Sequence, residues 1–189
     1  HLESVRVAVD HELARFLDAH VARAATVGDA PRIIAEATRA LSLRGGKRFR
    51  PALLAAAYEA CGGEGGLSVV VLAGVALELL QSYLLIHDDW MDNDDVRRGG
   101  PTVHAALGAA FGSRSLGATS AVLAGDHASG LAQAALLGVP LAPPRVCEAA
   151  REFARIQEDV ALGQMLDVHM SAGDPAAVER MHDLKTGSY

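Results

Sequence analysis

The sequence is poor in aromatic residues, with one tryptophan, three tyrosines and four phenylalanines among 189 residues. Runs of β-branched residues are also scarce, whereas alanine and leucine are abundant. Because strands are built mainly from β-branched and aromatic residues, this composition argues against a sheet and predicts an all-α protein. Half of the residues are apolar, which is enough to give one domain a sizeable core.

An excess of basic charge and a cysteine framework are also missing. The formal net charge of −6 argues against a broad nucleic-acid surface, so no nucleic-acid partner is expected. Cys61 and Cys147 have neither metal-ligand spacing nor a disulfide pattern, which fits a reducing compartment. We interpret each as a small buried apolar residue. The N-terminal residues show no signal-peptide pattern, and a cytoplasmic location is expected.

Two apolar runs, residues 67–87 and 116–139, approach the length of a membrane span. The first contains Glu78, and the second contains Asp126 and His127. Polar residues inside such runs favour helices buried in a protein bundle over helices in lipid. The sequence therefore predicts no membrane span.

Apolar residues recur at helical spacing along the whole chain, interrupted by Gly-rich and Pro-rich breaks. This pattern predicts a single-domain helical bundle over residues 1–189, with helices at residues 2–26, 31–43, about 51–61, 67–92, 102–111, 116–137, 145–171 and 175–186. Pro31 is expected to open the second helix, since proline is favoured in the first turn. The most apolar helix, residues 67–92, should lie near the centre.

That central helix ends in a cluster of aspartates followed by Arg97 and Arg98. Asp88 and Asp92 are four residues apart, so a helix places them on one face, where their charges repel. Oxygen ligands of this kind favour Mg²⁺ or Ca²⁺, and arginine suits phosphate. A solvated acidic helix end is the alternative, but acids at a helix C-terminus oppose the helix dipole. The pattern indicates a diphosphate site.

Residues 46–51 form a second, cationic segment. Lys47 and Arg50 are three apart and can share a face at a helix start, where anions are also favoured. An ordinary basic loop is the alternative for this segment alone. Gln81 lies about 20° from Asp88 on a helical wheel, so it is either a satisfied core amide or a ligand donor.

These motifs resemble those of the trans-isoprenyl diphosphate synthases, the polyprenyl synthetase family. Residues 88–92 followed by 97–102 are similar to the family's first aspartate-rich motif, and residues 46–51 to its upstream basic motif. Gly163-Gln164 with Asp167, and Lys185-Thr186, also match in order. The resemblance implies an all-α fold of the isoprenoid synthase type, which forms homodimers around a deep central cavity.

Carried over position by position, the resemblance implies a role for each matching residue. Asp88 and Asp92 would bind Mg²⁺, two or three ions in all, that holds the allylic diphosphate. The same diphosphate would be contacted by Arg97, Lys185 and Thr186. The diphosphate of isopentenyl diphosphate would be bound by Lys47, Arg50 and Arg98, with Gln81 beside it. The cavity would be lined by Gln164 and Asp167.

The resemblance also suggests the product. An aromatic residue five before Asp88, here Tyr83, with Leu84 at four before, implies a short-chain enzyme that makes geranylgeranyl (C20) or farnesyl (C15) diphosphate. On an ideal wheel Tyr83 lies about 140° from Asp88, so it could close only a tunnel along the helix flank. The expected activity is a head-to-tail trans-prenyltransferase that ionises the allylic diphosphate, condenses it with isopentenyl diphosphate and loses a proton.

One departure from the family pattern is the second aspartate-rich motif, which in the family follows the Lys-Thr pair. The sequence ends at Tyr189 without it. We therefore expect an N-terminal portion of the domain, truncated at the C-terminus, with a partly liganded Mg²⁺ site and no activity by itself. The alternatives are a class I terpene cyclase, against which Lys47, Arg50 and Arg98 argue, and a non-catalytic synthase-like regulatory subunit.

Overall fold

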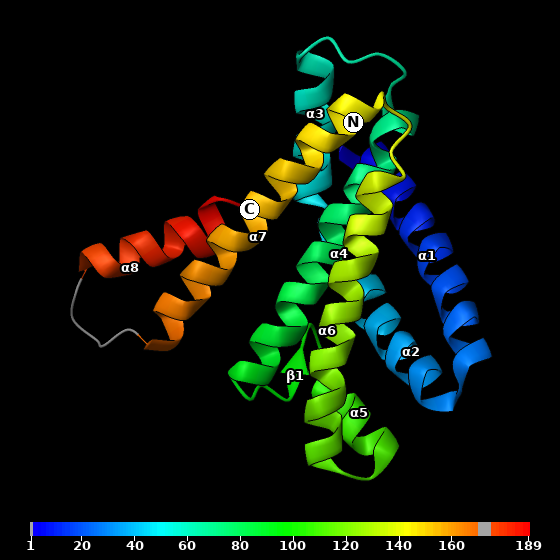
Figure 1. Ribbon diagram of the computed structural model, residues 1–189, viewed down its shortest axis with the longest axis vertical. Helices are drawn as coiled ribbons and strands as arrows, with labels where there is room; N and C mark the ends of the chain where they lie inside the picture. The colour runs from blue at the N-terminus through cyan, green and yellow to red at the C-terminus, as the bar shows by residue number, and fades with distance from the viewer. Residues whose placement is uncertain (1, 170–174) are drawn as a thin grey trace. The chain divides into compact units, whose positions relative to one another are not determined.

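The computed structural model describes residues 2–169 and 175–189 and is built almost entirely from helices (Figure 1). The all-α prediction is confirmed. The helices are α1 (Leu2–Val27), α2 (Asp29–Leu43), α3 (Phe49–Ala60), α4 (Leu67–Met91), α5 (Val103–Phe111), α6 (Arg114–Leu137), α7 (Pro143–His169), α8 (Pro175–His182) and the π-helix η1 (Asp183–Gly187). The strands are β1 (Val96–Arg97) and β2 (Gly100–Pro101).

The chain divides into two compact units, His1–Pro140 and Leu141–Tyr189. The first contains α1 to α6 and the β-hairpin, and the second contains α7, α8 and η1. Within the second unit, α7 packs against both α8 and η1. The single domain over residues 1–189 stays a prediction.

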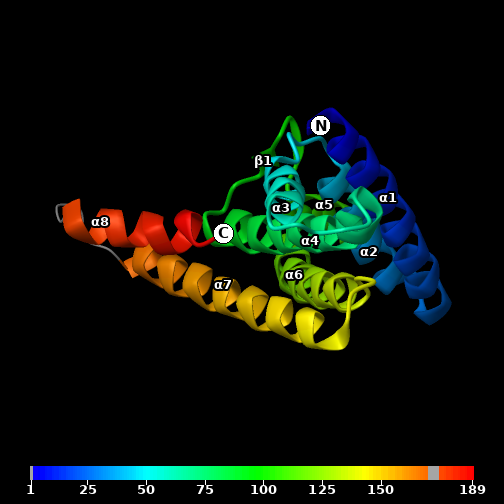
Figure 2. The same ribbon diagram turned by 90° about the horizontal axis from the view of Figure 1, so that it is seen from above.

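Helix α4 is the centre of the first unit (Figures 1 and 2). It packs against α1, α2, α3, α5 and α6. Val75, Leu79 and Leu80 are completely buried, which explains why this segment is apolar on nearly every side. By length and composition alone α4 could cross a membrane. Its place among five helices is that of a core helix.

Small residues let the helices of the first unit approach closely. A Cβ on Gly117 of α6 would lie 2.4 Å from the backbone nitrogen of Gly108 in α5. A Cβ on Gly125 would lie 2.2 Å from Nε2 of His87 in α4. Glycine on α6 therefore allows close contact with the backbone of α5 and with the His87 ring of α4.

The β-hairpin follows α4 and was not predicted from the sequence. Its strands pair antiparallel, with Val96 opposite Pro101 and Arg97 opposite Gly100. The turn residues Arg98 and Gly99 have φ of 51° and 72°. Positive φ at both central positions is what a two-residue turn of type I′ requires.

Several local predictions need correction. Cys61 and Cys147 are exposed free thiols, not buried residues. Helix α2 begins at Asp29, so Pro31 lies within the first turn and does not open it; its missing N–H has no helical partner there anyway. Helix α6 begins at Arg114 because Ser113 caps it, accepting a hydrogen bond from the backbone N–H of Leu116 at 3.2 Å.

Helix α7 begins at Pro143, two residues before the predicted start. Proline suits the first helical turn, so the Pro143-Pro144 pair lies inside the helix and not in the break before it. The predicted end of this helix, at residue 171, lies outside the described residues.

Candidate functional site

The aspartates lie at the C-terminal end of α4 as the sequence predicts. Asp88 is in the last turn of the helix, and Asp92 is its C-cap, with helical dihedral angles. The backbone N–H of Asp92 donates to the carbonyl of Asp88 at 2.8 Å, so the two residues remain one turn apart. Asp88 is partly buried and Asp92 is exposed.

Asp89 is paired with Arg97 at the end of α4. Asp89 is fully buried, and its Oδ1 accepts a hydrogen bond from Nε of Arg97. Arg97 Nη2 also lies 3.5 Å from Oδ2 of Asp88. Burial raises the pKa of the Asp89 carboxyl, and the hydrogen bond from Arg97 opposes that rise. The guanidinium is thus fixed beside the predicted metal ligands.

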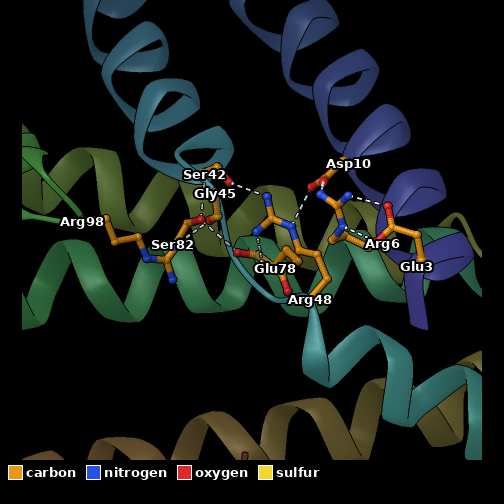
Figure 3. A network of polar contacts seen from close by, with 9 residues as sticks. All are labelled: Glu3, Arg6, Asp10, Ser42, Gly45, Arg48, Glu78, Ser82 and Arg98. Carbon is orange, nitrogen blue, oxygen red and sulfur yellow. Dashed lines mark hydrogen bonds and ion pairs between the residues drawn. The ribbon is translucent and has the colours of Figure 1, made fainter.

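The basic segment contains a buried cation, Arg48 (Figure 3), and an accessible one, Lys47. Arg48 is buried, and its guanidinium donates to Asp10 Oδ1 at 2.7 Å, Glu78 Oε2 at 2.5 Å and the Ser42 carbonyl at 3.1 Å. Lys47 is exposed beside it. Arg48 therefore stabilises the fold, and Lys47 is available to a ligand.

Arg50 and Gln81 come together although they are 31 residues apart in the sequence. Arg50 Nη1 donates to Oε1 of Gln81 at 2.7 Å, between α3 and α4. This contact orients Gln81 toward the basic segment, on the helix stripe that also holds Asp88. The core-amide interpretation of Gln81 is only part of its role in the structure, since its partner is a cation.

The hairpin joins the acidic and basic motifs. Arg98 Nη1 donates to the carbonyl of Gly45 at 2.7 Å, as Figure 3 shows. Because Arg97 precedes it and contacts Asp88, one short hairpin bridges the end of α4 and the residues that lead into α3. Motifs about fifty residues apart are therefore neighbours.

Tyr83 faces α6 and not the stripe of Gln81 and Asp88. Its ring lies edge-on to that of His87 with centroids 4.9 Å apart, and it packs on the core cluster that includes Ala121 of α6. Burial raises the pKa of the Tyr83 hydroxyl. This placement is what the helical wheel predicts for the helix flank. Leu84 is partly buried.

In the second unit, the two other predicted motifs contact each other. A Cβ on Gly163 of α7 would lie 2.4 Å from the backbone nitrogen of Lys185, so glycine lets η1 lie directly on α7. Lys185 Nζ is 2.5 Å from Oδ2 of Asp167. Thr186 is exposed and Gln164 is partly buried. π-Helical turns are frequent at functional sites.

The residues at the end of α4 fit a magnesium ion that is shared with a substrate. Among residues 2–169 and 175–189 no group of three or more His, Cys, Asp or Glu side chains is arranged to hold a metal. Mg²⁺ is usually bound through one or two carboxylates, waters and substrate phosphates. Asp88 and Asp92 supply that number of carboxylates, and Asp89 is engaged by Arg97.

Arg44 was missed by the sequence analysis. It is the C-cap of α2, and its Nη1 donates to the carbonyls of Arg97 at 3.1 Å and Pro101 at 2.8 Å. An arginine before a Gly-Gly pair carries no sequence signal for such a contact, since its acceptors are more than fifty residues away and belong to the unpredicted hairpin.

An all-helical bundle with aspartates at the end of its central helix, and cations facing them, has the architecture of the isoprenoid synthases. The family model for polyprenyl synthetase matches residues 31–189, which is most of the chain. The chain belongs to the polyprenyl synthetase family.

Named relatives agree with this assignment. The chain is 40% identical to geranylgeranyl diphosphate synthase of Methanosarcina mazei over 138 residues, which cover 73% of this chain and 39% of the relative. It is 36% identical to geranylfarnesyl diphosphate synthase of Natronomonas pharaonis, covering 73% and 42%. The chain thus spans about two fifths of the length of these curated relatives.

Solved structures show the same fold. Geranylgeranyl pyrophosphate synthase of Corynebacterium glutamicum, complexed with isoprenyl diphosphate and magnesium, superposes with a TM-score of 0.90 at 29% identity. The match covers 100% of this chain and 57% of that one. The predicted isoprenoid synthase fold is therefore confirmed.

Proposed function

We propose that the protein is a trans-prenyltransferase that condenses isopentenyl diphosphate with an allylic diphosphate and gives a short-chain prenyl diphosphate, C20 or C15. One observation carries the proposal. The Arg98–Gly45 hydrogen bond ties the basic segment to the hairpin that holds Arg97 beside Asp88. The basic segment and the hairpin thus place two groups of cationic side chains next to an acidic helix end. This arrangement suits two diphosphates, one of them bound through a metal cation.

The reaction requires charge stabilisation more than a protein base. The allylic carbon–oxygen bond breaks, and its electron pair leaves with the diphosphate. The double bond of isopentenyl diphosphate then forms the new carbon–carbon bond. The resulting cation loses a proton to the departed diphosphate, and the electron pair of that carbon–hydrogen bond becomes the double bond of the product. Arg97 would stabilise the developing negative charge, while Lys47 and Arg50 would hold the second diphosphate. Mg²⁺ bound through Asp88 and Asp92 would add positive charge at the leaving group.

The proposal is tested with the protein expressed from its whole gene, in Mg²⁺ buffer with geranyl or farnesyl diphosphate. We expect a longer prenyl diphosphate only when isopentenyl diphosphate is added. A hydrocarbon formed from the allylic substrate alone would identify a terpene cyclase. The absence of any product would refute the proposed activity and leave the regulatory subunit as the explanation.

Two variants test the assigned roles. Lys47→Ala and Arg50→Ala should each raise the KM for isopentenyl diphosphate about 10- to 150-fold, which corresponds to the free energy of one hydrogen bond to a charged group. The KM for the allylic substrate should change little. Asp88→Ala should instead lower kcat. Arg39→Ala is the matched control, since this half-exposed arginine pairs with Asp18 of α1 at 2.6 Å, and the change should leave both constants unaltered.

We also propose a homodimer in the cytoplasm. Leu116, Leu123 and Leu137 of α6 are exposed at intervals that are multiples of seven residues, so they form one apolar stripe. Light scattering should give twice the chain mass, and Leu123→Arg should give the single mass; a monomeric wild type would contradict the proposal.

The exposed thiols of Cys61 and Cys147 support a reducing compartment, which cell fractionation tests.

The predicted roles of Gln164, Asp167, Lys185 and Thr186 in substrate binding stay predictions. Their support is the motif order in the sequence and, within the second unit, the contact of Lys185 with Asp167.

A further inference from the structure

A single arginine closes the base of the hairpin that carries the cationic side chains. Arg44 Nη1 donates to the Arg97 carbonyl on β1 and to the Pro101 carbonyl at the end of β2. Both acceptors are backbone atoms, so the guanidinium fixes the path of the chain and leaves the side chain of Arg97 pointing at the aspartates. The donor comes from the end of α2, immediately before the glycines of the basic segment.

Gly100 of the hairpin leaves space for this guanidinium because it has no side chain. A Cβ on Gly100 would lie 2.7 Å from Cζ of Arg44 and 2.9 Å from both Nε and Nη1. All three of the nearest atoms belong to Arg44. A side chain at this position would therefore displace the guanidinium of Arg44, and the glycine is explained by this contact and not by its backbone angles.

The hairpin needs such an anchor because it is weak by itself. Its strands have two residues each, and isolated two-stranded hairpins are at best marginally stable in water. The turn also holds Arg98 at a φ of 51°, which is unfavourable for a residue with a side chain. A surrounding contact must hold this geometry.

We propose that Arg44 is a positioning residue that sets both diphosphate sites at once. It would not touch either substrate. Through one hairpin it places Arg97 at the allylic diphosphate and Arg98, bonded to Gly45, at the isopentenyl diphosphate. The inference rests on the proposed function for the identity of the ligands.

The test compares Arg44→Ala with Arg44→Lys and with Arg39→Ala, in the protein expressed from its whole gene. Misplacement of both arginines should lower kcat and raise the KM for isopentenyl diphosphate together, so that kcat/KM falls about 10- to 100-fold. Lys47→Ala should change the KM alone. Lysine at position 44 keeps a cationic donor and should recover part of the loss, while Arg39→Ala should match the wild type.

A merely structural role would give a different result. Melting temperature is measured for each variant, and a lower melting temperature with unchanged kinetic constants at 25 °C would overturn the inference. If Arg44→Ala does not fold, Gly100→Ala replaces it, because the added methyl displaces the guanidinium from the other side. Combining the two changes should cost no more than Arg44→Ala alone, and additive losses would contradict a shared contact.

A binding measurement separates this inference from the proposed activity. Titration with inorganic pyrophosphate and Mg²⁺ should show weaker binding by Arg44→Ala than by wild type and Arg39→Ala. If the wild type makes no prenyl diphosphate, the proposed function fails, and the titration still decides the role of Arg44. Equal pyrophosphate affinity in wild type and Arg44→Ala would refute it.

Discussion

Replacing the buried Arg48 with methionine should destabilise the first unit by about 3–5 kcal/mol, the usual cost of removing one partner from a buried ion pair. The Arg48 side chain is 2% exposed, and its partners Glu78 and Asp10 are 12% and 37% exposed. Asp10 can regain water, but Glu78 would remain as a nearly buried charge without its cation. Most of the cost therefore comes from Glu78 and from the Ser42 carbonyl, which loses its donor.

The effect is measured by thermal unfolding followed by circular dichroism at 222 nm. At about 2–4 °C per kcal/mol for a chain of this size, the melting temperature should fall by roughly 6–20 °C. Lys47→Met is the matched control, because that neighbouring side chain is exposed and should change the free energy of unfolding by less than about 0.5 kcal/mol.

A second substitution tests the cause. In the Arg48→Met background, Glu78→Gln removes the uncompensated charge, so it should restore part of the lost stability, although in the wild type the same change is destabilising. A melting temperature within about 2 °C of wild type for Arg48→Met, or a further loss on adding Glu78→Gln, would refute the reasoning.

Three further predictions concern other parts of the chain. Gly163→Ala should press its methyl on the Lys185 backbone and cost about 1–3 kcal/mol in unfolding free energy; an unchanged urea midpoint would contradict this close packing. Burial lowers the pKa of both His20 and His127, so the unfolded chain binds protons more readily, and stability should be complete above about pH 6.5 and fall below it. The urea midpoint of unfolding should therefore fall from pH 7.5 to pH 5.5. A midpoint that does not change with pH would contradict this prediction. Tyr83→Ala should lengthen the prenyl product, measured by chromatography, and an unaltered product profile would remove Tyr83 as the floor of the tunnel.

The helices could be predicted from the sequence because they are apolar periodic runs between Gly-rich and Pro-rich breaks, although α2, α6 and α7 each begin two residues before the predicted start. The central run from Leu67 is an example, since Gly65-Gly66 precede it and the aspartates end it. The hairpin could not be predicted. Its strands are too short for an alternating pattern, and the turn pair Arg98-Gly99 is an unusual choice for two positive φ angles.

Motif and spacing predicted which residues could form the candidate site, and the structure brings Arg97 to Asp88 and Arg50 to Gln81. The different surroundings of adjacent residues within a motif could not be predicted. Lys47 and Arg48 are adjacent cations that no sequence rule distinguishes. Arg48 is buried because Asp10 of α1 and Glu78 of α4 meet at its guanidinium, and both are at least thirty residues away in the chain. A sequence pattern that considers only residues near one another in the chain cannot predict such long-range pairing.

The adjacent aspartates at positions 88 and 89 have different surroundings in the structure, since Asp89 is buried and Asp88 is only partly buried. Successive residues on a helix point about 100° apart, so Asp88 and Asp89 cannot both face the same ion. The structure uses the difference: Asp89 turns inward and holds Arg97, while Asp88 and Asp92 remain on the other face, one turn apart. The inward acid neutralises the charge of Arg97, whose guanidinium also lies 3.5 Å from Asp88. Under the proposed function, Asp89 would hold Arg97 in place while Asp88 and Asp92 bind Mg²⁺.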